Sequence, residues 1–243
     1  MSGPERKLGG QSIVEAAIDL FDQREYLLPE FTPAFHSSRE RELREQIVDI
    51  VRRSCQRHLM ISTEGVVSAR LDDDSFLITP TGYDRPAIDH ESIVLVENSQ
   101  REAGKIPSRA VRLHQAIYQQ RPEIHCIITA QAPYVTAYSI AEKALATRTI
   151  PESYIMLLDV PKIPFGKQYT DPEAVAQIIS SQCPVVLLQN DCVMTTGSSI
   201  LQTFDRLEVS EFTARSLIET ASIGELVPIG EDEIVALKTR FLS

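Results

Sequence analysis

The sequence of 243 residues contains no tryptophan, only 5 histidines and only 4 cysteines. The cysteines (Cys55, Cys126, Cys183 and Cys192) include no CxxC pair, which is the spacing of many zinc sites and redox dithiols. We therefore expect reduced, buried thiols rather than disulfides or a metal site. Basic residues are in the minority too, with 24 Lys and Arg against 34 Asp and Glu and a net charge of −10. This balance argues against nucleic acid or an anionic membrane as the main partner, because clustered Lys and Arg bind phosphate groups.

Long hydrophobic runs are also missing. No apolar stretch approaches the roughly 20 residues that a membrane span needs, and the start, MSGPERKLGGQS, lacks the apolar segment of a secretory signal. We expect a cytoplasmic protein that spans no membrane. The composition, 43% hydrophobic and 24% charged, is typical of a folded globular protein. Its length allows one large domain or two small ones.

Residues 1–38 differ from the rest and are expected to form an N-terminal arm with one short helix. Apolar residues recur at helical spacing in IVEAAIDLFDQREYLL, which predicts that helix. Pro29 and Pro33 follow and cannot continue it. We expect this part of the arm to pack on the body in extended form, with Phe31 and Phe35 as anchors.

Residues 39–243 are expected to form one mixed α/β domain. Short turns join consecutive strands, so helices on a largely antiparallel sheet fit better than a doubly wound parallel sheet. The predicted strands cover 66–70, 75–79, 92–97, 125–130 and 184–190, and the predicted helices cover 39–58, 109–120, 133–142, 171–182 and 199–221. The chain is expected to end with the last of these helices, whose inner face would include Ile200, Phe204, Leu207, Ala214 and Ile218.

Three segments together resemble the class II aldolase/adducin family. They are STEGVVSARLDDDSFLITPTG, IPSRAVRLHQAIYQQRPEIHCIITAQAPYVTAYS and PVVLLQNDCVMTTGSSILQTFDRLEVSEFTARSL, and the similarity extends over residues 41–221. The resemblance implies that residues 39–243 form an α/β/α layered domain with a largely antiparallel, mixed central sheet. In the enzymes of this family, a zinc ion held by three histidines polarises the carbonyl of a sugar phosphate. A glutamate exchanges protons, and a loop of small residues binds the phosphate.

All four catalytic positions that the resemblance implies are changed in this chain. Thr129 and Gln131 stand where the His-x-His pair is expected, and Asp191 stands in place of the third histidine. The glutamate position, four residues before His114, is Ala110. A hydroxyl, a carboxamide and one carboxylate do not make a zinc site, because zinc prefers imidazole or thiolate. We therefore expect no metal and no other cofactor.

The remaining histidines and Cys192 are not expected to replace the lost groups. His114 lies on a predicted helix and His125 at the start of a strand, so both are interpreted as structural. The other three histidines, His36, His58 and His90, lie in polar or turn-like segments and are expected to be exposed. Cys192 precedes the apolar Val193 and Met194, a setting more typical of an inert thiol than of a nucleophile.

The residues expected to bind phosphate are better preserved. Gly65, Thr81, Gly82 and Ser108 keep the residue types of the family pattern, whereas Val66 replaces an asparagine and Arg109 a serine. One interpretation is an anion site, with Ser108 and Arg109 at a helix N-terminus and with close approach of backbone N–H groups. The other is purely structural, with turn glycines, a helix cap and a solvated arginine.

The centre of the site also allows two interpretations. If the fold holds, Thr129, Gln131 and Asp191 face one another, and Arg109 or Arg112 could neutralise the aspartate. These groups would form either a hydrogen-bonded polar plug or a metal-free site for a polar small molecule.

The leading functional hypothesis is a metal-free, non-catalytic pseudo-aldolase that acts as a small-anion-binding, regulatory or structural subunit. A phosphorylated small molecule is the expected ligand. By resemblance, the chain would form a homo-oligomer (a tetramer) or a hetero-oligomer with a catalytically intact paralogue. The alternative is a sugar-phosphate aldolase, lyase or epimerase-like enzyme with a rebuilt site, using Asp191 as base and Arg109 as anion clamp. The nearby lysines, Lys162 and Lys167, are expected to be surface residues.

Overall fold

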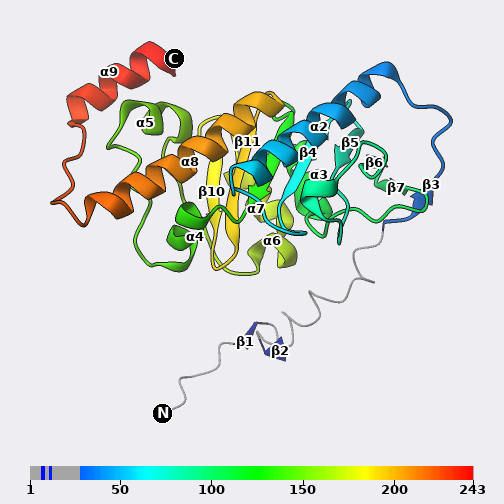
Figure 1. Cartoon of the computed structure of the whole chain (residues 1–243), viewed down its shortest axis with the longest axis horizontal. Helices are drawn as coiled ribbons and strands as arrows, with labels where there is room; N and C mark the ends of the chain where they lie inside the picture. Colours follow the sequence, from blue (N-terminus) through cyan, green and yellow to red (C-terminus); the bar gives the residue numbers. More distant parts are fainter. Residues whose placement is uncertain (1–6, 9–10, 13–27, 243) are drawn as a thin grey trace.

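The computed structural model describes residues 7–8, 11–12 and 28–242. Within these ranges, nine strands form one sheet in the order β3-β7-β6-β5-β4-β8-β11-β10-β9, and β1 pairs with β2 separately (Figure 1). Neighbouring strands of the large sheet are antiparallel except in the outermost pairs, β3 with β7 and β9 with β10, which confirms a mixed, largely antiparallel sheet. The strands are β1 Lys7–Leu8, β2 Gln11–Ser12, β3 Glu30–Phe31, β4 Val66–Arg70, β5 Ser75–Ile78, β6 Val94–Glu97, β7 Gln100–Glu102, β8 Cys126–Ala130, β9 Lys162–Ile163, β10 Val185–Leu188 and β11 Cys192–Gly197. The helices are α2 Ser38–Gln56, α3 Val111–Gln120, α4 Pro133–Ile140, α5 Pro151–Leu157, α6 Lys167–Thr170, α7 Pro172–Ile178, α8 Ile200–Thr220 and α9 Glu231–Phe241, with a 3-10 turn at η2 Arg85–Ala87.

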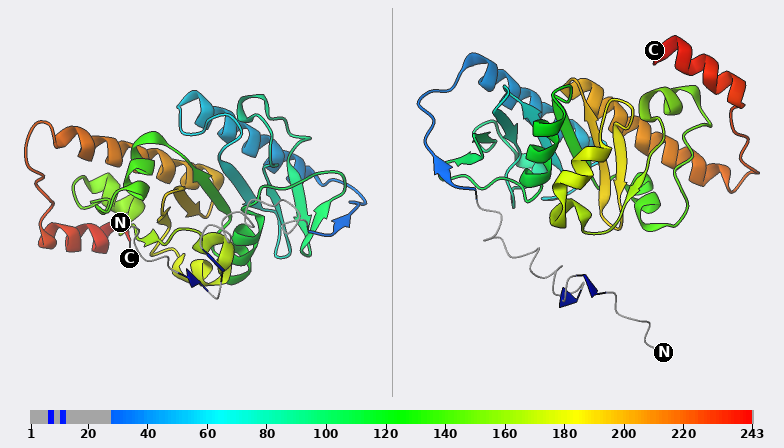
Figure 2. Two further views of the ribbon diagram at one scale, coloured as in Figure 1. Left: turned by 90° about the horizontal axis from the view of Figure 1, so that it is seen from below. Right: turned by 180° about the vertical axis from the view of Figure 1, so that it is seen from behind.

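Helices cover both faces of the large sheet, which confirms the α/β/α layers. The long helices α2 and α8 cross one face (Figure 1), and the view from behind in Figure 2 shows α3, α6 and α7 on the other. Each face has its own apolar core, and β4 contributes to both: Val67 packs on the α2 and α8 side and Val66 on the α3 and α7 side. Because strand side chains alternate between faces, a strand buried on both sides carries a continuous apolar run.

Serine caps begin the two long helices. The Ser37 hydroxyl accepts a hydrogen bond from the Glu40 N–H at 3.0 Å, and the Ser199 hydroxyl accepts one from Gln202 at 3.2 Å. Such caps satisfy N–H groups that have no partner within the helix. Arg53 of α2 lies over the Phe204 ring of α8, 4.5 Å from its centroid, and joins the two helices across the face.

The C-terminal part contains helices that the sequence patterns did not predict. The chain continues past α8 into α9, which packs on α5 through Ile234 and Tyr154. The expectation that the chain ends with the helix at residue 221 is therefore wrong. The proline-rich stretch 151–172 contains α5 and α6, and Pro151 opens α5 at a position where its missing N–H is harmless.

One detail of the predicted packing is wrong, and one strand was not predicted. On α8, Leu217 is buried, whereas Ile218 is 41% exposed, because the inward stripe drifts as the helix leaves the sheet. The strand β11 escaped prediction because its second half is threonine and glycine, although Thr195 and Thr196 are buried and donate hydrogen bonds to backbone carbonyls.

Residues 28–31 lie in extended form against one edge of the large sheet. Strand β3 pairs with β7, and the Arg101 guanidinium bonds to the carboxylate of Glu30 at 2.7 Å. Phe31 packs against the core, but Phe35 is 78% exposed and is not the anchor that we expected. The helix predicted in IVEAAIDLFDQREYLL lies outside the described residues except at its end, and the boundary at residue 38 stays a prediction.

In the part of the chain that the structure describes, no helix has the length and hydropathy needed to cross a bilayer. The expected location in the cytoplasm stays a prediction.

His114 on α3 is fully buried, as the structural interpretation predicts. Its Nδ1 is hydrogen-bonded to Ser68 Oγ at 2.8 Å, and that hydroxyl also bonds to the Tyr118 hydroxyl at 2.7 Å. Its Nε2 has no hydrogen-bond partner. Burial lowers the pKa of His114 from 6.5 to about 3. The folded protein therefore keeps this imidazole neutral at physiological pH.

This histidine should make the fold sensitive to mild acid. The unfolded chain protonates His114 below its ordinary pKa and the folded chain does not, so the free energy of unfolding should fall by about 1.4 kcal/mol per pH unit below that value. Urea unfolding at pH 7 and pH 5 measures this: the wild type should lose about 2 kcal/mol more than His114→Gln. Equal losses in both proteins would contradict the assigned burial.

Candidate functional site

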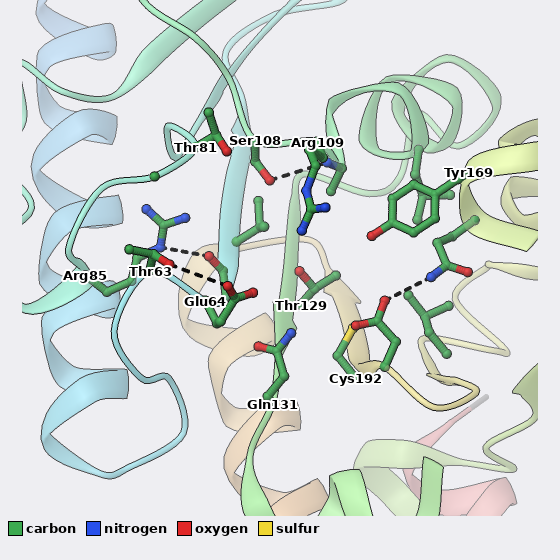
Figure 3. A pocket seen from close by; sticks show the side chains of 18 residues that line it. Thr63, Glu64, Thr81, Arg85, Ser108, Arg109, Thr129, Gln131, Tyr169 and Cys192 are labelled. Atoms are coloured by element: carbon green, nitrogen blue, oxygen red, sulfur yellow. Dashed lines mark hydrogen bonds between the residues drawn. The ribbon is translucent and has the colours of Figure 1, made fainter. Parts of the chain in front are cut away.

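A pocket of about 320 Å³ opens where the ends of β8 and β10 meet the start of α3 (Figure 3). All nine candidate positions from the sequence line it: Gly65, Thr81, Gly82, Ser108, Arg109, Ala110, Thr129, Gln131 and Asp191. The structure adds Thr63, Glu64, Val66, Arg85, Leu113, Gln168, Tyr169, Leu188 and Cys192. The sheet brings together residues more than 120 positions apart in the sequence, and the polar groups surround a cavity rather than filling it. This outcome favours a ligand site over a polar plug.

Backbone turns and small side chains form one wall of the pocket. Gly65 has φ +94°, and a Cβ there would lie 2.6 Å from Met60 Cγ, so only glycine fits this turn. Gly82 has φ +66°, and a Cβ at this position would meet no atom within 4 Å. Glycine is therefore favoured here by the backbone conformation of the turn and not by packing. The Thr81 N–H donates to Ile106 O at 3.1 Å and ties the two loops of this wall together.

Ser108 and Arg109 lie in the turn before α3 rather than on the helix itself. The N-cap of α3 is Ala110, and its N–H donates to Ser108 Oγ at 3.3 Å. The Ser108 N–H donates to Thr79 O at 3.0 Å, which fixes the turn against β5. The Ser108 hydroxyl therefore supports the start of the helix and also lines the pocket, and its role in anion binding stays a prediction.

Two arginines face the pocket. Arg85 is only 2% exposed, and its Nε donates to Gly65 O at 2.9 Å. Figure 3 shows the Arg109 side chain entering the pocket between Ser108 and Tyr169, pointing toward Thr129. Burial raises the pKa of both Asp191 and Tyr169, and the charge of Arg109 partly opposes this shift, which places the guanidinium within electrostatic reach of these two groups. Arg112, the other candidate partner of the aspartate, is exposed and does not line the pocket.

Asp191 lies in the tight turn between β10 and β11, opposite Arg109. Burial raises its pKa, and the charge of Glu64 raises it further, while Gln168, Arg109 and Gln131 counteract the shift. Gln168 Nε2 donates to Asp191 Oδ2 at 2.9 Å. A carboxyl group in this setting holds its proton to higher pH than an ordinary aspartate.

Two further groups near Asp191 are acids that resist ionisation. Burial raises the pKa of Tyr169, aided by the charges of Asp191 and Cys192. Burial likewise raises the pKa of the Cys192 thiol, with Asp191 adding to the effect. The nucleophile at a reactive cysteine is the thiolate, so this environment agrees with the interpretation of Cys192 as an inert thiol.

The residues at the family metal positions do not fit zinc. Thr129 and Gln131 offer a hydroxyl and an amide, and the raised pKa of Cys192 disfavours a thiolate ligand. Gln131 Oε1 is buried without a hydrogen-bond partner, which agrees with space for a ligand donor rather than with a completed polar network. Across the described residues, no group of at least three His, Cys, Asp or Glu side chains is arranged to hold a metal ion.

The histidines outside α3 lie away from the pocket. His36, His58 and His90 are exposed as expected, and His125, which we interpreted as structural, is exposed too and does not line the pocket. Side chains alternate along the chain at β8, and Cys126, the next residue, takes the inward position.

Comparison with known proteins identifies the family. A sequence profile described as "Class II Aldolase and Adducin N-terminal domain" matches residues 45–218. The chain belongs to the class II aldolase and adducin family. L-fuculose phosphate aldolase of Escherichia coli (strain K12) is 29% identical over 203 residues, covering 80% of this chain and 91% of the relative. The 3-oxo-tetronate 4-phosphate decarboxylase of Cupriavidus necator is 30% identical over 185 residues, covering 73% and 84%.

Solved structures in this family share the fold. The crystal structure of YgbL from Klebsiella pneumoniae, described as a putative aldolase/epimerase/decarboxylase, has a TM-score of 0.71 at 28% identity and covers 82% of this chain and 98% of that one. An L-fuculose 1-phosphate aldolase structure has a TM-score of 0.72 at 22% identity, covering 85% and 98%, and supports the fold alone. This chain therefore spans almost the whole length of both of these structures.

Sequence reasoning missed several pocket residues. Glu64 precedes the candidate Gly65 directly, and Arg85 follows Gly82 by three positions, so proximity in sequence was the available signal. Gln168 and Tyr169 come from α6, a short helix in the proline-rich stretch, and no sequence pattern connected that stretch to the site.

Proposed function

We propose that this chain is a sugar-phosphate lyase that works without a metal ion. The observation that carries the proposal is the division of one pocket into two ends. An anion-binding wall at one end holds Gly65, Thr81, Gly82, Ser108 and Arg85, and the other end holds Arg109 and the buried acid Asp191.

The anion-binding wall suits a phosphate group. Hydroxyls of Thr81 and Ser108 and the guanidinium of Arg85 line it, and the glycine turns let a ligand approach the backbone closely. The sugar chain would then extend toward Thr129, Gln131 and Asp191, whose hydroxyl, amide and carboxyl groups match a polyhydroxylated ligand.

Asp191 is proposed as the proton donor. Its raised pKa suits an acid, which replaces the role of base that we assigned to it from the sequence. In a retro-aldol cleavage, Asp191 gives its proton to the substrate carbonyl oxygen, and the Glu64 carboxylate takes the proton of the β-hydroxyl group. The carbon–carbon bond breaks, its electron pair forms the enol, and the hydroxyl-bearing carbon leaves as an aldehyde. A neutral carboxylic acid that hydrogen-bonds to a developing oxyanion is a known electrophilic device in enzymes without a metal.

The names of the relatives support this reaction class. An aldolase and a decarboxylase both break a carbon–carbon bond beside a carbonyl group of a phosphorylated sugar or sugar acid. The non-catalytic alternative is a regulatory or structural subunit that uses the same pocket. Such a subunit would bind the ligand but not cleave it. The expected homo-oligomer, or a hetero-oligomer with an intact paralogue, stays a prediction.

The deciding experiment incubates the full chain, after exhaustive dialysis against EDTA, with a panel of ketose 1-phosphates and sugar-acid phosphates. Mass spectrometry follows aldehyde or carbon dioxide release, and calorimetry follows binding. We expect turnover that survives the chelator. Binding without turnover would favour the non-catalytic subunit. Activity that requires added zinc would contradict the metal-free mechanism.

A further inference from the structure

Arg85 is a buried cation whose described contacts are with backbone carbonyls. Nε donates to Gly65 O at 2.9 Å and Nη1 to Tyr83 O at 3.4 Å. A guanidinium has five N–H donors, so about three remain beyond these two bonds. Among the residues that the structure describes, no carboxylate forms an ion pair with Arg85. Burial lowers the pKa of Arg85, and the nearby charge of Glu64 only partly opposes this shift.

Burial of an arginine without an adjacent counter-ion is costly, unless an anion binds there. Arg85 lines the pocket beside Gly65 and Gly82, so a ligand anion has access to it. It does not stand at any of the phosphate positions that the family resemblance assigns in this sequence.

Arg109 provides a second, separate cation. Figure 3 places it across the Thr81 and Ser108 wall from Arg85, on the side of Thr129 and Tyr169. Arg109 replaces a serine of the family pattern. A neutral hydroxyl is thus replaced by a guanidinium group, which can bind a carboxylate through two hydrogen bonds. The two arginines therefore face different ends of a bound chain.

The carboxyl groups of the pocket leave room for anions. Glu64 is exposed at the mouth, whereas Asp191 lies inside it, hydrogen-bonded to Gln168. Cys192 and Tyr169, the other ionisable groups around Asp191, are neutral acids. Of the described residues that line the pocket, Arg85 and Arg109 are thus the two cationic side chains, and Asp191 is the carboxyl group inside it.

We propose that Arg85 and Arg109 form a two-anion clamp, and that the ligand carries both a phosphate, held at Arg85, and a carboxylate, held at Arg109. This inference rests on the proposed function, because it assumes that the pocket binds a phosphorylated sugar. It narrows the ligand class to phosphorylated sugar acids.

Calorimetry with a matched ligand pair tests the clamp without any turnover. Erythronate 4-phosphate and erythritol 4-phosphate share a carbon chain and a phosphate and differ in one terminal group, a carboxylate or a hydroxymethyl. At fixed salt, wild-type protein should bind the acid about ten- to a hundredfold more tightly, because a charged hydrogen-bond pair replaces a neutral contact. Equal affinities would overturn the clamp and leave the proposed function standing. If neither ligand binds, the proposed function fails as well.

Variants assign the two ends. Arg109→Met should abolish the preference for the acid while keeping affinity for erythritol 4-phosphate within about threefold. Arg85→Lys keeps a positive charge, in case a neutral residue unfolds the turn. It should weaken the binding of both ligands about tenfold, because lysine lacks the paired N–H donors of the guanidinium group. The matched control is Arg112→Met, an exposed arginine one turn along the chain that does not line the pocket. A preference retained in Arg109→Met, or lost equally in the control, would overturn the assignment.

Discussion

Replacing Arg44 by methionine should lower the free energy of unfolding by about 3–5 kcal/mol. Arg44 of α2 is 4% exposed, and its guanidinium bonds to Glu40 and Glu102, in each case with a 2.8 Å contact. It also donates to the backbone carbonyls of His90 and Ile93. Methionine keeps the aliphatic stem but removes the cation that two buried carboxylates share, so Glu102 keeps only Lys105 as its cation among the described residues. Breaking a buried ion pair costs more than losing a surface contact.

Chemical unfolding in urea measures this effect, and Arg41→Met is the matched control. Arg41 lies on the same helix and is exposed, so its substitution should change stability by no more than about 0.5 kcal/mol. Similar losses in the two variants would show that the effect does not depend on the buried cluster, and would contradict the prediction. The cluster also bears on the candidate site, because it attaches α2 to β7, and the proposed anion-binding turns follow strands of the same sheet.

Acid should weaken the same cluster. Burial alone would raise the pKa of Glu102, but hydrogen bonds from Lys105, Arg44 and the Leu95 N–H together outweigh it and hold the pKa below its ordinary value. A carboxylate whose pKa is lower in the folded state stabilises the fold above its unfolded pKa, and this contribution is lost as pH falls through the folded pKa.

The fold was largely predictable because its local signals agree with the tertiary structure. Both faces of the central strands are buried, so continuous apolar runs such as PVVLL marked them directly. Helix α9 gave no comparable signal, because only Ile234 along it is buried and its partner surface comes from the unpredicted α5. Strand β11 was missed because its threonines are buried through hydrogen bonds, which an apolar pattern does not report.

The site was only half predictable for a different reason. The nine residues found in advance stand at positions that a family pattern fixes, and the structure brings all of them to one pocket. Arg85 lies in a turn that reads as solvent-exposed, and its burial depends on the path of a loop that no local pattern encodes. The raised pKa of Asp191 is also a property of the folded chain, since its neighbours Gln168, Arg109 and Gln131 come from three different segments.

Asp191→Asn should reduce turnover by about 10²- to 10⁴-fold, the usual contribution of a positioned proton donor. Asparagine keeps the size and much of the polarity of the side chain, including an oxygen that can accept the hydrogen bond from Gln168, but it has no acidic proton to donate. Ligand affinity should change much less than turnover, because the anion-binding wall is untouched. Asp49→Asn, an exposed change on α2, is the matched control and should leave turnover unaltered.

The pH profile distinguishes a proton donor from a residue that only shapes the pocket. Burial raises the pKa of Asp191, with Glu64 adding to the shift, so the protonated and active form persists to higher pH than in an ordinary aspartate. Wild-type turnover should therefore be highest on the acidic side and fall as pH rises through that raised pKa. The residual activity of Asp191→Asn should lack this decline. A variant with the same alkaline limb as the wild type would show that another group donates the proton, and Tyr169, whose pKa burial also raises, would be the next residue to replace.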